Sequence, residues 1–387
     1  MPVSPLVAAV AAYSARVLPD LLDLGPATSA LAPWMLAALV APGASGHAAI
    51  ALERELGLPA GPAAAELRRL LSAGPTALRC ALAAWRSVDL AGDGAFAAWE
   101  QTVPSVAATG PVPSQADADA WTLRQTLGLI ERFPLAVTPD TVALLAAAIA
   151  SRIRWDEPLG TGTAPANDWG LARMLYADPR GVHATDAGHV AVATSRSRAD
   201  QLEVHSFIAA PGTDRAGLVR AALRLVAAWH ADGAMDPAAW PVDPDTLPET
   251  GHAWTSETGY GDGSAMVPAF AERASAVDIA GLPGIREAGR VMATLVDEAL
   301  PPSRRPAVVD ARLSAVARYD RLGFEAAAVA GMGVMAGAMP GERRVLHLAF
   351  TRPHLVLAVA TDEVCAGLPL FAAWVDSGVM EPDDPAA

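Results

Sequence analysis

The stretch 308–382 constrains the fold most, because it places two apolar runs on either side of an unusual connection. Both runs are rich in β-branched residues and either alternate with polar residues or stay apolar, as strands do. The connection, residues 323–344, consists mostly of Ala, Gly, Met and Val, and Glu325 is its one acidic residue before Glu342. A solvated connection normally carries Ser, Asp, Asn or Lys, and one this long is usually functional. We therefore expect an exposed segment whose small side chains must later enter a narrow space.

The composition favours one large domain over residues 1–387. A chain of 387 residues that is 52% hydrophobic can bury a large core, and no Gly/Ser-rich or charged linker divides it. The 28 basic residues are outnumbered by 42 acidic ones and form no cluster, so neither nucleic acid nor an anionic membrane surface is an expected partner. Every basic residue is Arg, which excludes lysine nucleophiles, pyridoxal Schiff bases and phosphate loops that need Lys.

Cysteine usage and the N-terminal stretch bear on compartment. Cys80 and Cys365 each lie in an apolar run, which is typical of reduced core thiols and not of a disulfide or a metal site. The first sixteen residues lack the charged region of a signal peptide, and Pro and Gly interrupt the apolar stretch 24–44. We expect a cytoplasmic monomer without a membrane span, metal or cofactor, with an extracellular location as the alternative.

Hydrophobic periodicity predicts both helices and strands, in an α+β arrangement with more than one sheet. The stretch 78–85 fits a strand or a helix, whereas the Ala-rich run 141–155 favours a helix by composition alone. The predicted helices cover 3–22, 34–40, 47–56, 62–73, 121–133, 214–231 and 284–299, and the predicted strands fall within 190–208 and 267–274.

Two polar features have plain structural explanations, and a catalytic serine motif is absent. His183 and His189 lack the helical spacing of a zinc motif and fit a surface loop around Asp186. The glycines of 255–264 fit a polar turn, since a phosphate loop needs a strand before it and a helix after it. No Gly-x-Ser-x-Gly elbow occurs, so the sequence identifies no catalytic residue.

Several segments resemble those of one known family, the serpins. The run Gly323, Phe324, Glu325, Ala326, Ala327, Ala328, Val329 and Ala330 resembles the hinge of the serpin reactive-centre loop. The stretch 350–357 is similar to the C-terminal signature of the family, and 369–382 to its final strand. Further matches, in the family's order, are 29–46 to a buried helix, 148–159 to the strand whose Trp lies under the loop insertion point, and 267–285 to a strand and the following helix. The chain thus resembles a divergent, bacterial-type serpin.

The resemblance implies an α+β serpin fold in which helices surround a large central sheet A and smaller sheets B and C. It makes 141–155 a central strand and 323–344 an exposed reactive-centre loop. It also implies an inhibitor of serine proteases and not an enzyme: a protease cleaves the loop, and the cut loop inserts as a new strand of sheet A. A non-inhibitory serpin-fold binding protein is the alternative.

The resemblance also assigns roles to single residues. Trp155 is implied at the insertion point and Ser29 beneath the sheet, where Ala32, Ala147 and Leu313 take positions that often hold Ser, Asn and His. Phe324 replaces the usual small hydroxyl residue. If Glu325 faces water on insertion, alternation turns six side chains inward. These are Phe324, Ala326, Ala328, Ala330, Met332 and Val334.

The target protease follows from loop spacing. Counting from Gly323 as in the family places the scissile bond at about Gly337-Ala338, in the small-residue run that begins at Met335. This position favours a serine protease that prefers small or apolar residues, such as an elastase-like or subtilisin-like enzyme. Arg343 or Arg344, with a trypsin-like target, is the second choice.

Overall fold

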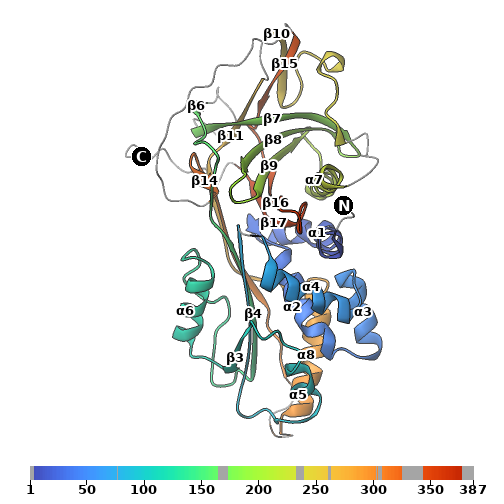
Figure 1. Ribbon diagram of the computed structural model, residues 1–387, viewed down its shortest axis with the longest axis vertical. Helices are drawn as coiled ribbons and strands as arrows, with labels where there is room; N and C mark the ends of the chain where they lie inside the picture. The colour runs from blue at the N-terminus through green and yellow to red at the C-terminus, as the bar shows by residue number, and fades with distance from the viewer. Residues whose placement is uncertain are drawn as a thin grey trace.

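The computed structural model describes residues 4–75, 77–163, 173–231, 239–259, 263–301, 303, 307–324 and 343–376, and it has a mixed α+β fold (Figure 1). Its helices are α1 (Pro5–Leu24), α2 (Leu31–Val40), α3 (Gly46–Leu56), α4 (Ala60–Ala73), α5 (Gly94–Glu100), α6 (Gln115–Gln125), α7 (Arg215–His230) and α8 (Ile285–Ala299). Short 3-10 turns occupy Ala41–Gly43 and Pro244–Thr246.

The described strands form one large sheet and two smaller ones. The large sheet has the order β1-β17-β16-β9-β8-β7-β11-β15-β10, with β6 paired to β7, and the smaller sheets have the orders β12-β13-β14-β5 and β3-β2-β4. The strand bounds are β1 Ala27–Thr28, β2 Leu78–Arg86, β3 Ala108–Pro111, β4 Ala143–Ser151, β5 Ile153–Arg154, β6 Thr161–Thr163, β7 Arg173–Thr185, β8 Gly188–Ser197, β9 Leu202–Ala209, β10 Trp254–Gly259, β11 Ser264–Pro268, β12 Phe270–Asp278, β13 Arg312–Tyr319, β14 Gly323–Phe324, β15 Arg343–Ala349, β16 His354–Ala360 and β17 Pro369–Val375.

Most predicted helices are confirmed because local signals set their ends. Gly57 ends α3 with a φ of +72°, a conformation that glycine adopts without steric cost. Glu287 accepts a hydrogen bond from the Gly284 backbone N–H at 2.8 Å and caps α8. The prediction for 121–133 was wrong in extent: the helix begins earlier, at the Ser114 cap, and ends before Leu127, whose φ of +55° turns the chain.

Strand β4 shows how packing overrides composition. The Ala-rich run favours a helix locally, yet it pairs with β2 from Leu78↔Ser151 to Arg86↔Ala143, as the family resemblance implied. Helix α6 covers one face, where Trp121 packs edge-on against Trp85 at 5.4 Å between ring centroids. Helix α2 and its neighbours lie on the other side (Figure 1). Small Ala side chains let both layers approach the sheet closely.

Two other sequence predictions need correction. Residues 255–264 are not a polar loop throughout, because Trp254–Gly259 forms β10 and pairs with β15, and Ser264 begins β11. The predicted surface loop holding two histidines is a β7–β8 hairpin with a tight turn at its tip. His189 is exposed, but His183 is fully buried against Trp229.

The cysteines and the first helix agree with a packed core. Cys80 and Cys365 are free thiols, and burial raises the pKa of Cys365 to about 11. Among the described helices, Pro5–Leu24 is long and apolar enough to cross a membrane, but more than half of its most apolar window is buried by the rest of the chain. Core helices commonly have this composition.

Candidate functional site

The two smaller sheets face each other across a gap, and we call them together the split sheet. Strand β4 pairs with β2 along one edge, and β13 pairs with β12 along one edge. Within the described residues, the facing edge of β4 has no strand partner, and that of β13 is paired only at Tyr319. Unpaired strand edges are ready templates for another strand. The gap therefore has the hydrogen-bonding groups to accept one.

At its upper end the gap is closed by β14, the first two residues of the expected hinge. Phe324 pairs with Tyr319 on one side and with Ile153 on the other, while Gly323 pairs with Arg154. The Asp320 carboxylate holds the preceding turn, accepting backbone N–H groups of Leu322 at 2.8 Å and Gly323 at 3.1 Å. The hinge thus starts as a strand between the two halves of the split sheet.

Trp155 lies beside this turn. Its indole N–H donates to the Asp320 carbonyl at 2.9 Å, and its backbone N–H donates to the Leu322 carbonyl at 3.1 Å. The ring lies 5.3 Å from that of Tyr319, whose hydroxyl forms a 2.6 Å hydrogen bond with Ser195. Burial raises the pKa of Tyr319, so it stays a neutral hydrogen-bonding group. Trp155 and Tyr319 thus form a buried aromatic cluster whose polar atoms are hydrogen-bonded, at the position that the resemblance assigns to loop insertion.

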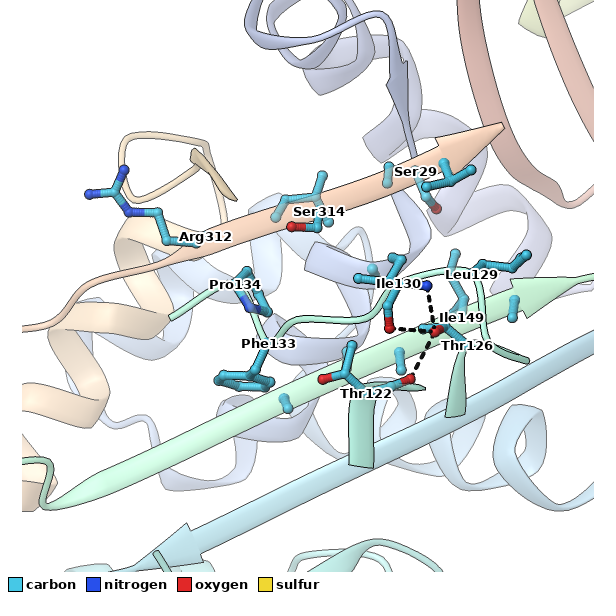
Figure 2. A pocket seen from close by; sticks show the side chains of 18 of the residues that line it. Ser29, Thr122, Thr126, Leu129, Ile130, Phe133, Pro134, Ile149, Arg312 and Ser314 are labelled. Atoms are coloured by element: carbon cyan, nitrogen blue, oxygen red, sulfur yellow. Dashed lines mark hydrogen bonds between the residues drawn. The ribbon is translucent and has the colours of Figure 1, made fainter. Parts of the chain in front are cut away.

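Below β14 the gap contains a cavity of about 90 Å³ between β4 and β13 (Figure 2). Ala32, Ala147 and Leu313, which the resemblance groups beneath the sheet, all line it together with Ser29. The Ser29 hydroxyl donates to the Leu370 carbonyl at 2.6 Å and accepts the Leu31 N–H at 3.1 Å. Backbone groups thus satisfy the Ser29 hydroxyl, and the other three residues named here contribute only apolar side chains to the cavity.

Phe324 is buried at the upper end of the cavity. Its side chain is 4% exposed, and its ring centroid lies 6.2 Å from that of Phe371 in β17. The apolar neighbours explain how a large ring occupies a position where the family has a small residue. Sequence reasoning identified Phe324 as a departure but had no signal for Phe371, because their contact joins separate sheets.

The segment 126–135, which follows α6, covers the cavity from outside. Thr126 fixes its start: its hydroxyl donates to the Thr122 carbonyl at 2.8 Å and accepts the Ile130 N–H at 3.1 Å (Figure 2). The Arg152 guanidinium donates to the Leu127 carbonyl at 3.0 Å, which ties the cover to the residue between β4 and β5. Periodicity had extended a helix through this stretch, so the cover was missed.

The remaining predicted residues are placed only in part. Glu325 to Ala330, Met335, Gly337 and Ala338 lie outside the described residues. Arg343 and Arg344 lie in β15, opposite Gly259 and Thr258 of β10. Arg344 also donates to the Ser256 hydroxyl, so this second-choice cleavage position is part of a paired strand.

Comparison with known proteins identifies this arrangement. No family model and no curated protein matches the sequence. Among solved structures, the thermophilic serpin tengpin in its native state has a TM-score of 0.68 at 13% identity, covering 95% of this chain and 93% of that one. Serpin48 of the insect Tenebrio molitor gives 0.61 at 15%, with 96% and 97% covered. Thyroxine-binding globulin in complex with thyroxine gives 0.63 at 13%, with 96% and 98% covered. The chain therefore has the serpin fold.

Proposed function

We propose that the protein inhibits serine proteases by the serpin mechanism, in which the cleaved loop inserts into the gap of the split sheet. The observation that carries this proposal is β14, a strand that begins between β13 and β5. Below it, the part of the chain that the structure describes provides no strand partner for the facing edges of β4 and β13. An inserted strand would give those edges hydrogen-bonded partners on both sides. The bound protease would be carried along before its acyl-enzyme hydrolyses.

The register of β14 supports this proposal. Continued downward, the pairing of Phe324 with Ile153 and Tyr319 brings position 328 opposite Ile149 and Ala315. Directly opposed residues share a face, so alternate positions point into the cavity. In this register position 326 lies opposite Ser151 and Ala317, and position 330 opposite Ala147 and Leu313. All three inward positions hold Ala, which suits a cavity of about 90 Å³.

The charge of Glu325 also fits this register, which would place Glu325 on the face of the inserted strand that is turned away from the cavity. Position 325 falls opposite Arg152 on one side and Arg318 on the other. Both arginines alternate out of phase with the buried residues of their strands. The Glu325 carboxylate would therefore meet two guanidiniums on insertion, whereas on the inward face it would be buried.

The first test is complex formation. The protein is incubated with an elastase-like or a subtilisin-like protease, and the mixture is boiled in SDS. We expect a covalent complex of protease and inhibitor, because insertion outpaces deacylation. A protease whose nucleophilic serine has been blocked is the control and must give none. Complete loop cleavage without a stable complex, for every protease that cuts the loop, would contradict the proposal.

The position of the cut is a separate prediction. We expect cleavage between Gly337 and Ala338, detected as the mass of the released C-terminal peptide. Arg343 and Arg344 are poorer candidates, because a protease subsite binds an unpaired extended chain and both arginines pair with β10 as part of β15. Cleavage only after one of these arginines would overturn the preference for small residues and indicate a trypsin-like target.

The alternative, a non-inhibitory binding protein, is favoured by the large side chain at the hinge, since an oversized residue there would slow insertion. The burial of Phe324 against Phe371 argues that the site accommodates it. Replacing Phe324 with Thr is therefore expected to lower the thermal midpoint by several degrees and to leave the stoichiometry of inhibition equal or worse. A Thr variant that inhibits far better would mean that overpacking limits the natural protein and would favour the binding-protein alternative.

A further inference from the structure

A second cavity, of about 160 Å³, lies below the first at the lower end of the split sheet. It is enclosed by α2, α8, the start of β4 and residues 307–312. Its walls are almost entirely aliphatic, and the side chains that define it include Leu36, Val40, Leu145, Ile279, Met292 and Val296. Protein cores are normally close-packed, so an unfilled space of this size is unusual. The proposed inhibition does not require it.

Residues 307–311, which we call the flap, form the mouth of this cavity. The flap is neither helix nor strand, and it is anchored at both ends. The Ala307 N–H donates to the Asp297 carboxylate at 2.6 Å, and the Ala311 carbonyl accepts the Ile279 N–H at 3.0 Å. Between these anchors Val308 is 92% exposed and Val309 is 43% exposed, although both line the cavity. Apolar side chains therefore lead from solvent into an apolar interior.

Guanidinium groups surround this mouth. Arg312 lines the cavity, and Arg290 lines a shallow groove that shares Gly289 and Val309 with it. Arg312 is held by Asp310 at 2.9 Å and lies 3.7 Å from Asp278. Arg290 is 70% exposed, and its ion pair with Glu287 is long, at 3.8 Å.

The acidic groups nearby are already engaged. The Glu287 carboxylate is 5% exposed, accepts the Gly284 N–H and pairs with Arg286 at 2.9 Å, which is closer than Arg290. Asp297 accepts the flap N–H described above. Among the described arginines at this mouth, Arg290 thus has the weakest acidic contact, and it is placed to meet an anion.

We propose that this cavity binds a medium-chain carboxylate, with the hydrocarbon tail inside and the carboxylate at Arg290 and Arg312. An apolar cavity of about 150 Å³ admits a molecule of six carbons such as benzene, so a tail of about six to eight carbons fits. The carboxylate gains charge-assisted hydrogen bonds at the rim. The recognised chemistry is a flexible apolar chain that ends in one negative charge.

Binding here would also oppose strand insertion, because a strand continued in the register of β14 reaches Leu145, which lines this cavity. This consequence alone rests on the proposed function. Ligand binding can be measured on the native, uncleaved protein. Binding and its effect on strand insertion are therefore tested by separate measurements.

The test uses sodium octanoate, with octan-1-ol and acetate as probes of the tail alone and the charge alone. We expect octanoate to raise the thermal midpoint in proportion to the logarithm of its concentration and to give a saturable heat in calorimetry. Acetate should do neither. Replacing Arg290 with Ala should weaken the affinity for octanoate about fivefold and leave the affinity for octanol unchanged. The control, Arg68→Ala on the exposed surface of α4, should change neither affinity.

A cavity-filling variant tests the location. Ala288 is buried and lines the cavity, so Ala288→Leu should abolish binding of both octanoate and octanol without lowering the thermal midpoint. Ala65→Leu, on the exposed face of α4, should bind as the parent does. No binding of octanoate at millimolar concentration, or unchanged binding by Ala288→Leu, would overturn the site. Binding that leaves the yield of protease complex unchanged would overturn only the competition with insertion.

Discussion

On the proposed mechanism, replacing Ala328 with arginine is expected to turn the protein from an inhibitor into a substrate. If the loop inserts in the register set by β14, residue 328 would point into the cavity between Ile149 and Ala315. A guanidinium there would be buried without an acidic partner, at a cost of several kcal/mol that strand insertion must offset. Cleavage precedes insertion, so the loop should still be cut at the parental rate. On a denaturing gel the complex should disappear while the cleaved species accumulates.

Ala328→Ser provides the matched control, because it keeps the volume of the side chain and adds no charge. It should retain most of the complex. If Ala328→Arg inhibits as well as the parent, strand insertion does not account for inhibition. If both variants lose the complex, the position tolerates no polar atom, and the result does not depend on charge.

The second large effect concerns Glu272, a carboxyl group buried in β12. Its side chain is 2% exposed, and one carboxylate oxygen has no hydrogen-bond donor in the described part of the structure. Burial, together with a smaller contribution from the nearby Asp376 carboxylate, raises the pKa of Glu272 to about 8. The native protein therefore carries a protonated Glu272 at neutral pH.

Replacing Glu272 with Gln should stabilise the protein at alkaline pH. Between about pH 4.5 and pH 8 the unfolded chain has released the Glu272 proton while the native chain retains it, so stability falls as the pH rises. Each unit of pKa difference corresponds to roughly 1.4 kcal/mol, which makes the total several kcal/mol. We expect Glu272→Gln to unfold at higher urea than the parent at pH 8, and at similar urea at pH 4.5.

The control for this prediction is Glu131→Gln, since Glu131 is exposed. This variant should follow the parent at every pH. If Glu272→Gln and the parent lose stability equally between the two pH values, the carboxyl group is solvated or paired in solution, and the predicted pH dependence is wrong.

Local sequence signals were sufficient for most helices. The apolar face of α8, with the Gly284 and Glu287 cap, defines that helix without any tertiary contact. The small residues from Ala326 to Ala330 and the order of motifs around them indicate the serpin fold from the sequence alone. These features are readable because they depend on neighbours within a few residues or on composition.

Only the tertiary structure decided the rest. The run 143–151 has the composition of a helix and becomes a strand because β2 pairs with it and layers cover both faces. His183 is buried by Trp229, which is distant in sequence, and Phe324 is accommodated by Phe371 from another sheet. The gap itself is set by which edges of β4 and β13 find partners. By itself, the sequence determined most of the helices, the fold class and the run of small residues that follows Gly323. The strand identity of β4, the edge of β4 that has no strand partner among the described residues and the cavity beside it arise from contacts between segments far apart in the chain, which no local pattern encodes.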